Sequence, residues 1–429
     1  MRTSAPVRAR RLALVSMATL GAVALSACGL ARSSASGSPV ATAPAATNVS
    51  AAAAAAASSG PGSSGPATTR PAVSASSPAT GAAAAPAPAG GPVPAGFAAT
   101  SVTFVSVSEA FVLGTAPCAH APCTSIARTL DRGVSWTGVP APVVPLGDPY
   151  DNTGQAAVWG IRFASPDEGF VFGSGLWVTK DGGEHWTAAA SPPGGGIVDL
   201  EVIDGQLLAL MDDCSQAGGC PPAETLERSP LSGGPWTLVA RVSDARVIAT
   251  QARVAAVLDG GHVVVSGDGG LTVATRPLPC GDAAGTDGSA VAVTGPGSLA
   301  LLCAGGAAMG SVRKTVYVSG NLGASWVKAG SPPFGGDPWG ISAASAAKLV
   351  VAAASGASWL YYSADGGARW SVAYTAIGGG AGFNDLGFTT AADGVVVYGP
   401  AYRDGNSDEV PGQLLLSGDG GASWTAVKF

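Results

Sequence analysis

The chain has 429 residues and a formal net charge of −6, with 12% charged and 47% hydrophobic residues. Six of its 22 basic residues precede residue 99, where no acid occurs, so the rest of the chain carries 16 basic against all 28 acidic residues. An acidic surface of this kind excludes a nucleic-acid-binding protein, because phosphates require clusters of Lys and Arg.

The first 27 residues are predicted to be an export signal. Four arginines precede an apolar run over 12–25, which is too short to cross a bilayer as a mature helix. The following Leu25-Ser26-Ala27-Cys28 is similar to the bacterial lipobox, in which the Cys becomes the lipidated first residue. We expect acyl chains on Cys28 and attachment to the extracytoplasmic face of the cell membrane through lipid alone. An ordinary secretory signal is the alternative.

Residues 28–95 are predicted to be a disordered tether. They consist almost entirely of Ala, Pro, Ser, Gly and Thr, and contain no aromatic residue. Such a segment cannot bury enough apolar surface to offset the entropy of ordering, and its prolines keep it extended. The heavy use of Ala and Gly with few lysines indicates a GC-rich genome, such as that of an actinobacterium.

One eight-residue motif, [S/T]-x-D-x-G-x-x-W, returns seven times after residue 128. Its third copy has Leu231 in place of the acid, and its fourth has Val273 in place of the Trp. From the first copy to the last the mean period is 48 residues, which is typical of a propeller or solenoid. The acidic or amide and aromatic positions are Asp131, Trp136, Asp181, Trp186, Asp268, Asn321, Trp326, Asp365, Trp370, Asp419 and Trp424.

The motif predicts a tight hairpin turn. The acid accepts hydrogen bonds from backbone N–H groups, the Gly supplies a positive φ, and the Trp packs under the turn. We therefore expect a structural role for all of these residues. Between two turns, residues 159–165, 169–173, 176–179 and 186–189 read as four short strands, and four strands per period make one propeller blade.

The other periods fit the same template, so the prediction is an all-β, seven-bladed β-propeller over residues 96–429. A six-bladed or an eight-bladed ring stays open, because the fourth period is only 37 residues long. The last blade supplies all four of its own strands, so the ring does not require a strand borrowed from the N-terminus.

The seven motifs resemble the Asp-box, or BNR, repeat of sialidases and of the photosystem II stability factor type of propeller. The resemblance implies the fold. A sialidase would also need three converging arginines, a Tyr nucleophile with its Glu, an Asp and an early Arg-Ile-Pro, and this sequence has no such tripeptide and few propeller arginines. We assign no catalytic residue, no metal ligand and no cofactor.

Six cysteines remain after Cys28, and an even number in an exported chain predicts disulfides. Proximity pairs them as Cys118 with Cys123, Cys214 with Cys220, and Cys280 with Cys303. Zinc is the rival ligand for these thiols, but no C-x-x-C pair occurs and the three His residues are scattered.

The motif turns join the third and fourth strands of each blade, so ligands are expected on the opposite face. The loops predicted there include all three cysteine pairs and an acidic loop over 403–409. Trp159 and Trp339 would line the mouth and stack on a ligand, or pack between blades instead. The candidate ligand-face residues are Asp148, Tyr150, Trp159, Asp199, Asp337, Trp339 and Asp385.

The sequence favours a monomeric, non-catalytic scaffold that binds an envelope protein or glycan. The alternative is an extracellular glycoside hydrolase, which would need two carboxylates about 5 to 10 Å apart at the mouth. Asp148, Asp151, Asp199, Asp337 and Asp385 are the acids that would supply such a pair.

Overall fold

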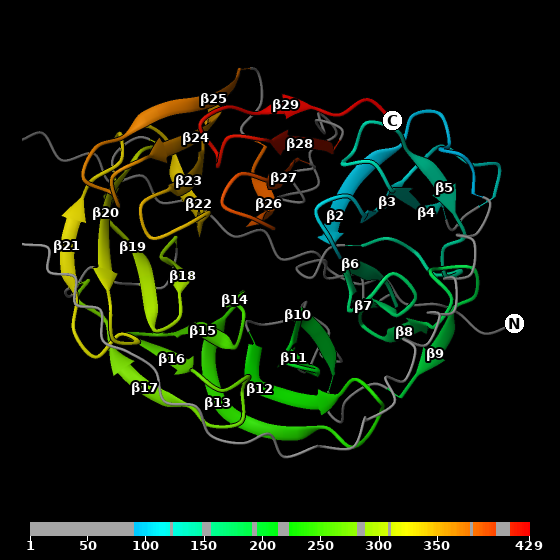
Figure 1. The fold of residues 1–429 in the computed structure, drawn as a ribbon, viewed down its shortest axis with the longest axis horizontal. Coiled ribbons are helices and arrows are strands. Elements are labelled where there is room, and N and C mark those ends of the chain that lie inside the picture. The colour runs from blue at the N-terminus through cyan, green and yellow to red at the C-terminus, as the bar shows by residue number, and fades with distance from the viewer. Residues whose placement is uncertain are drawn as a thin grey trace, which may run out of the picture. The chain divides into compact units, whose positions relative to one another are not determined.

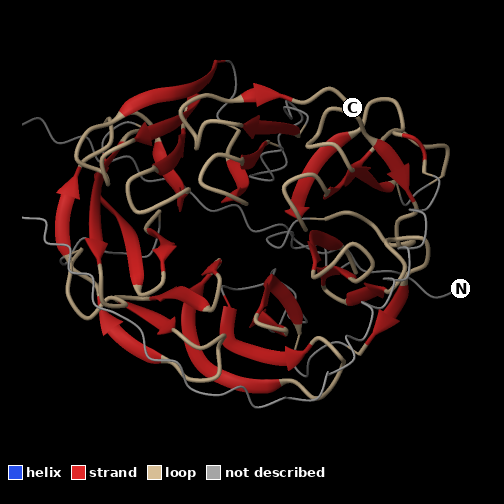
Figure 2. Ribbon diagram, in the orientation of Figure 1, coloured by secondary structure: helices blue, strands red, loops and turns tan. Residues whose placement is uncertain are grey.

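The computed structural model describes residues 90–120, 123–147, 156–190, 195–212, 223–280, 288–307, 310–377, 381–399 and 412–429. All of them belong to one compact unit, Ala82–Phe429. Every regular element in these ranges is a β-strand (Figure 2), and they contain no helix long and apolar enough to span a membrane. The predicted signal peptide, Cys28 and the tether up to residue 89 lie outside the described residues.

The strands form seven separate antiparallel sheets, which are arranged as the blades of a ring (Figure 1). Each blade consists of consecutive strands, called A to D from the centre outward. Blades 1 to 4 contain β2 (Ala98–Phe104), β3 (Ala110–Thr115), β4 (Thr124–Thr129) and β5 (Thr137–Val139); β6 (Val158–Phe163), β7 (Gly169–Gly173), β8 (Leu176–Thr179) and β9 (Thr187–Ala189); β10 (Gly196–Ile203), β11 (Gln206–Asp212), β12 (Ala223–Pro230) and β13 (Thr237–Ala245); β14 (Ile248–Gln251), β15 (Val254–Asp259), β16 (His262–Ser266) and β17 (Ala274–Pro277).

Blades 5 to 7 follow the same plan. They contain β18 (Ala290–Gly295), β19 (Ser298–Ala307), β20 (Val312–Ser319) and β21 (Val327–Gly330); β22 (Asp337–Ala343), β23 (Leu349–Ala354), β24 (Ala357–Ser363) and β25 (Ser371–Ile377); β26 (Phe383–Phe388), β27 (Gly394–Tyr398), β28 (Gln413–Ser417) and β29 (Thr425–Ala426). The predicted seven-bladed, all-β propeller is confirmed.

Blade 4, the shortest period, is a complete blade. It fits four strands into the short period because its connections are short: two residues separate β13 from β14, β14 from β15 and β15 from β16. One strand has no counterpart in the sequence prediction: β1 (Gly91–Pro92) lies in the range assigned to the tether and pairs with β5 at the outer edge of blade 1.

The ring closes without an exchanged strand, as predicted, because blades 1 and 7 each supply their own four strands. The seam is held by the Ala99 N–H, which donates to the Gly412 carbonyl at 2.9 Å. The ring of the last residue, Phe429, lies 4.7 Å from that of Phe97 and 5.1 Å from that of Trp136, both in the N-terminal part of the propeller. The C-terminus is thereby packed against blade 1.

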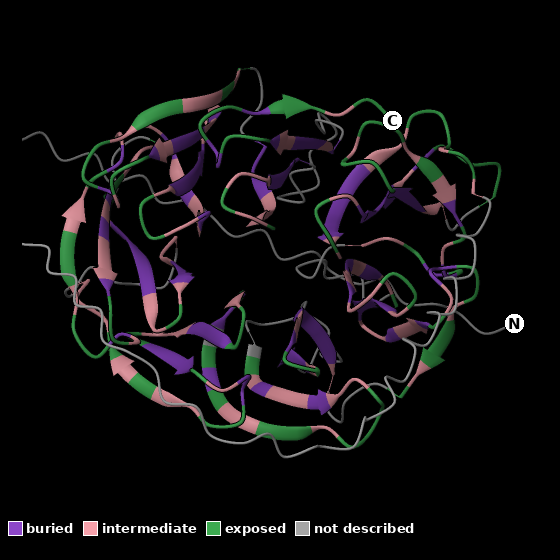
Figure 3. Cartoon of the chain, in the orientation of Figure 1, coloured by how far each residue is buried: buried purple, intermediate pink, exposed green. Residues whose placement is uncertain are grey.

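The hydrophobic core lies between neighbouring blades rather than inside each one. Strands A to C are largely buried, whereas the outermost strands are exposed on alternate residues (Figure 3). Between blades 1 and 2, for example, Phe111 stacks on Phe163 with 3.6 Å between ring centroids. Each blade thus presents two apolar faces, and burial of both requires neighbours on both sides.

The Asp-box turns join strands C and D and have the predicted geometry. In the last copy, the Ser417 hydroxyl oxygen accepts the Gly421 N–H at 2.9 Å, and the Asp419 carboxylate accepts the Ser423 N–H at 3.0 Å. The indole N–H of Trp424 donates to the Gly421 carbonyl at 3.1 Å, and Gly421 has a φ of 96°. A turn closed by its own side chains folds independently of its neighbours, so each copy can be identified from sequence.

Candidate functional site

Two of the predicted disulfides are present in the described residues. Cys118 and Cys123 are bonded in the B–C connection of blade 1, with an S–S distance of 2.01 Å. Cys280, which follows the last strand of blade 4, is bonded at 1.97 Å to Cys303 on the B strand of blade 5. Cys118, Cys123 and Cys280 lie on connections of the face opposite the Asp-boxes, whereas Cys303 lies within β19. Cys214 and Cys220 lie outside the described residues.

An ion-pair network occupies the centre of the ring and joins five blades. Its hub is Arg162 on β6, the innermost strand of blade 2. The guanidinium Nε donates to Glu201 Oε1 at 2.8 Å, and Nη2 contacts Asp385 Oδ1 at 3.0 Å and Asp199 Oδ1 at 3.5 Å. Nη1 lies 3.4 Å from the Ser101 hydroxyl of blade 1. One cation therefore faces three carboxylates from blades 3 and 7.

The carboxylates of this network also link one innermost strand to the next. Asp199 Oδ2 accepts the Ile248 N–H of blade 4 at 2.8 Å, and Asp385 Oδ2 accepts the Val102 N–H of blade 1 at 2.8 Å. Glu201 Oε2 lies 3.3 Å from the Thr250 hydroxyl of blade 4. The polar centre therefore ties blades 7, 1, 2, 3 and 4 together, across the seam of the ring.

Burial of this network shifts its protonation equilibria. Burial raises the pKa of Glu201 to about 7, although Arg162 acts in the opposite direction. Burial also raises the pKa of Asp199. For Arg162, burial alone would lower the pKa, but the Asp385, Glu201 and Asp199 carboxylates raise it well above its ordinary value. The guanidinium stays charged, while Asp199 and Glu201 hold protons more readily than in water.

Asp385 reaches its two partners from a strained backbone. Its φ is 49°, in the left-handed region that residues other than Gly rarely adopt. The residue lies where the register between β26 and β27 shifts, between Asn384 and Gly387. A bulge at this point redirects the side chain toward the centre of the ring. Strain of this kind persists only where the surrounding contacts fix it.

The two predicted mouth tryptophans are placed at the interfaces between blades. The indole N–H of Trp159 donates to the Ile197 carbonyl of blade 3 at 3.0 Å. The ring of Trp339 lies against Gly382 at the start of blade 7, 2.2 Å from the position that a Cβ on that glycine would occupy. Each ring therefore packs between blades, which was the alternative to stacking on a ligand.

The remaining candidates lie in different places. Asp199 and Asp385 belong to the central network, whereas Asp337 begins β22 and is half-buried. Asp148, Tyr150 and Asp151 lie outside the described residues, as does the acidic loop over 403–409.

Sequence reasoning missed Arg162 and Glu201. One feature of the sequence could have identified Arg162. The innermost strands of blades 2 and 6 both contain the tripeptide Trp-Gly-Ile, and the next residue is Arg162 in blade 2 but Ser342 in blade 6. A charged residue that replaces a small one at an inward-facing strand position requires a buried counter-charge.

A second buried charge, also missed, lies between blades 5 and 6. Lys314 on β20 is only 1% exposed, and its Nζ contacts four backbone carbonyls, those of Val312 at 3.0 Å, Phe334 at 2.9 Å, Gly335 at 2.9 Å and Gly336 at 2.7 Å. Burial lowers the pKa of Lys314 to about 8, whereas the nearby Asp337 carboxylate raises it. This ammonium group holds the connection between the two blades in place.

A cluster with metal-ligand chemistry occurs on the Asp-box face. Asp181, Glu184 and His185 bring one ligand atom each within 4.8 Å of one another in the part of the chain that the structure describes. The cluster is the second Asp-box itself, in which Asp181 already accepts the His185 N–H at 2.9 Å and contacts its ring Nδ1 at 2.7 Å. These contacts account for the cluster as a turn.

The arrangement of the central acids bears directly on catalysis. Both oxygens of Asp385 have protein partners, and so do both oxygens of Asp199, which also accepts the Leu200 N–H at 3.0 Å. A carboxylate that acts on a substrate must be within hydrogen-bond reach of that substrate. In this geometry the pair serves to connect blades.

Comparison with known proteins identifies the fold. No protein-family model and no curated protein matches the chain. Among solved structures, YCF48 from Cyanidioschyzon merolae is 14% identical, with a TM-score of 0.50 over 76% of this chain and 97% of that one. YCF48 bound to D1 peptide is 14% identical, with a TM-score of 0.48 over 77% and 93% of the two chains. A polysaccharide lyase of family PL25, an ulvanlyase bound to -[GlcA(1-4)Rha3S]-, is 13% identical, with a TM-score of 0.49 over 79% and 96%.

Proposed function

We propose that this protein is a lipid-anchored propeller of the bacterial envelope that acts as a non-catalytic scaffold for a protein or glycan. The observation that carries the proposal is the central network, in which three acids of the described residues, Asp199, Glu201 and Asp385, form contacts between blades. The glycoside hydrolase alternative requires a carboxylate pair that is free to contact substrate. Asp199 and Asp385 hold protein partners on all of their oxygens.

The scaffold would bind through the ligand face, which is the face opposite the Asp-boxes. The connections that lead into the innermost strands and the loops held by disulfides lie on this face. Large apolar side chains are exposed at this end of the blades: Ile377, the last residue of β25, at 89%, and Phe334, in the connection between blades 5 and 6, at 50%. Loops held by a rigid ring and by disulfides keep a fixed shape, which lowers the entropy lost on binding.

The binding face can be tested with a matched pair of variants. The full chain, solubilised in detergent, is incubated with an envelope glycan panel and with cross-linked envelope proteins. We expect Ile377→Ser to reduce capture of a specific partner at least tenfold, because it removes an exposed apolar contact on the ligand face. Val134→Ser is the control, since Val134 is 83% exposed in the Asp-box turn of blade 1.

Two outcomes would contradict the scaffold. Equal loss of capture in Ile377→Ser and Val134→Ser would show that the partner does not bind specifically to the ligand face. Release of sugar from the glycan panel by the wild-type protein would support the hydrolase instead.

The lipid anchor is tested separately. Cys28→Ala removes the only thiol in the lipobox, so we expect the protein to move from the membrane fraction to the soluble exported fraction. Metabolic labelling with a fatty acid should mark the wild-type chain and not the variant. Membrane retention of Cys28→Ala would show that another segment anchors the chain.

A further inference from the structure

The outer rim between blades 4 and 5 differs in charge from the rest of the propeller. No Asp or Glu occurs between Gly288 and Gly336, although the chain as a whole has 28 acids and 22 basic residues. The Asp-box of blade 5 has also lost its acid, since Asn321 stands in the position of the Asp. Blade 5 therefore carries positive side chains without local negative ones.

Strand register gathers these side chains on one surface, which we call the 4/5 rim: Arg276, Arg313, Tyr317, Trp326 and Lys328. Tyr317 and Trp326 pack into the core shared by blades 4 and 5. Arg313 and Tyr317 are four residues apart on β20, an even spacing that places both side chains on the same face. Lys328 lies directly opposite Tyr317 on β21 and shares that face.

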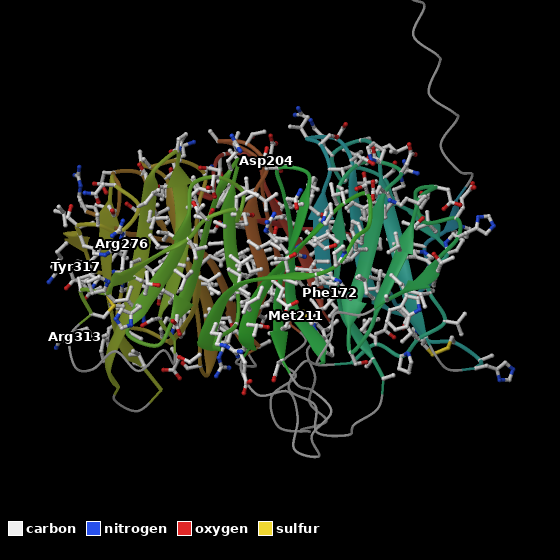
Figure 4. All side chains as sticks on the ribbon, turned by 90° about the horizontal axis from the view of Figure 1, so that it is seen from below. Phe172, Asp204, Met211, Arg276, Arg313 and Tyr317 are labelled. Atoms are coloured by element: carbon white, nitrogen blue, oxygen red, sulfur yellow. A yellow bond between two sulfur atoms is a disulfide. The ribbon has the colours of Figure 1, made fainter. Side chains whose placement is uncertain are left out.

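Blade 4 contributes Arg276 to the same surface. Arg276 is two residues after Ala274 on β17, so the two side chains share a face of the strand. Ala274 packs into the core shared by blades 4 and 5, so Arg276 also faces blade 5. The position that a Cβ on Gly323 would occupy lies 3.2 Å from Trp326 Cζ2 and 3.5 Å from Arg276 Cβ, so both side chains meet at this glycine. Figure 4 shows Arg276, Tyr317 and Arg313 along one side of the ring.

Two hydrogen-bond donors at this surface are buried and unused. Arg276 Nε and Trp326 Nε1 have no partner among the described residues. The tryptophans of three other Asp-boxes donate to their own box glycine: Trp136 to Gly133 at 3.1 Å, Trp370 to Gly367 at 2.8 Å and Trp424 to Gly421 at 3.1 Å. Trp326 has the same motif position, but its indole N–H is left for another acceptor. Native proteins rarely leave buried donors unsatisfied.

We propose that the 4/5 rim is a binding site for an oxyanion, such as the phosphate, sulfate or carboxylate group of a larger ligand. The exposed Arg313 and Lys328 attract the anion. Arg276 Nε and Trp326 Nε1, which are enclosed in the free protein, donate hydrogen bonds to the anion after their side chains turn outward. Tyr317 and Trp326 are half-buried, and the part of each ring that the core leaves uncovered supplies a surface for a sugar ring carrying the anion. The site lies on the outer rim and includes neither Ile377 nor Phe334, the exposed apolar side chains of the ligand face, so it stands or fails independently of that proposal.

The test is titration of the full chain with inorganic phosphate, sodium sulfate and a glucuronate disaccharide, followed by calorimetry and by tryptophan fluorescence. We expect saturable binding of at least one probe that weakens as salt rises. Trp326→Phe, which keeps the ring and removes the N–H, and Arg276→Met should each weaken binding at least tenfold. Binding of the disaccharide alone would identify a sugar acid as the source of the anion, and binding of phosphate would identify a phosphoryl group.

Two control variants make the test specific. Trp136→Phe removes an indole N–H that is already bonded to the Gly133 carbonyl, and Arg253→Met removes an exposed guanidinium that is paired with Asp204 at 2.8 Å. Both should bind the probe as the wild type does. Unfolding temperatures of all variants establish that they are folded, and Trp326→Phe is conservative enough to fold if Arg276→Met does not. Absence of saturable binding to every probe, or equal loss in the control variants, would overturn the proposal.

Discussion

Replacing Arg162 with Met should lower the free energy of unfolding of the propeller by about 3–5 kcal/mol. Arg162 is the one cation at the centre of three carboxylates, so its removal leaves Asp199, Glu201 and Asp385 buried against one another. Met keeps an unbranched apolar stem without the guanidinium, so the loss reports removal of that group with its charge and hydrogen bonds. Urea unfolding followed by tryptophan fluorescence measures the difference.

The matched control is Arg253→Met. Arg253 pairs with Asp204 at 2.8 Å, but both side chains are exposed, at 59% and 40%. Exposed ion pairs contribute only about 0–1 kcal/mol, so this variant should unfold nearly as the wild type does. If Arg162→Met and Arg253→Met lower the free energy of unfolding by the same amount, the central network contributes no more to stability than an exposed ion pair does.

The effect of Arg162→Met should depend on pH, and the sign follows from the network itself. Burial raises the pKa of Glu201 from 4.5 to about 7, so between these values the folded chain holds a proton that the unfolded chain has released. Stability from this group is therefore lost as pH rises through about 7. Arg162 lowers the pKa of Glu201 and Asp199, so without it these two acids hold protons more tightly still, and the variant's deficit should be larger at pH 8 than at pH 5. A deficit that is constant over this range would contradict the assignment.

Replacing Lys314 with Met should lower the free energy of unfolding by at least about 2 kcal/mol, because each buried group left without a partner costs about 1–3 kcal/mol. The Val312 and Phe334 carbonyls lose their donor, whereas Gly335 keeps the Tyr361 hydroxyl and Gly336 keeps the Val312 N–H. The substitution keeps an apolar side chain of similar length but leaves the Val312, Phe334, Gly335 and Gly336 carbonyls without the ammonium group. The connection between blades 5 and 6 should loosen first. Hydrogen exchange of the amides in this connection, together with urea unfolding, measures both effects.

Lys180→Met is the control for this second prediction. Lys180 contacts Glu168 on the surface of blade 2 and is 61% exposed. Its loss should change the free energy of unfolding by less than about 1 kcal/mol. Unchanged hydrogen exchange around Gly335 in Lys314→Met would show that the four carbonyls are stabilised in another way.

The blade pattern could be predicted from sequence because each blade is local. The Asp-box turn is closed by residues within a few positions of one another, as the Ser417, Asp419 and Trp424 contacts show. The strands of one blade are consecutive and antiparallel, so their order needs no long-range information. The same holds for Cys118 and Cys123, which are five residues apart.

The candidate site was only partly predictable, because its contacts join residues far apart in the chain. Asp199 and Asp385 were selected as acids near the mouth, but nothing local showed that both would contact Arg162, which lies 223 residues before Asp385. Trp159 and Trp339 were compatible with two positions, and the neighbouring blade decided between them.

By itself, the sequence determined the repeat, the four-strand pattern of a blade and the self-contained turn, because these depend on hydrogen bonds and packing within a few tens of residues. The structure then selected seven blades over six or eight. Only the tertiary structure decided which charges meet. Closing the ring brings the innermost strands of blades 7, 1, 2, 3 and 4 around Arg162 and places Lys314 among four carbonyls. It also leaves Arg276 and Trp326 with unused donors at one rim. Burial then sets the protonation and strength of these groups, and burial depends on neighbours that the chain reaches only after the ring is complete.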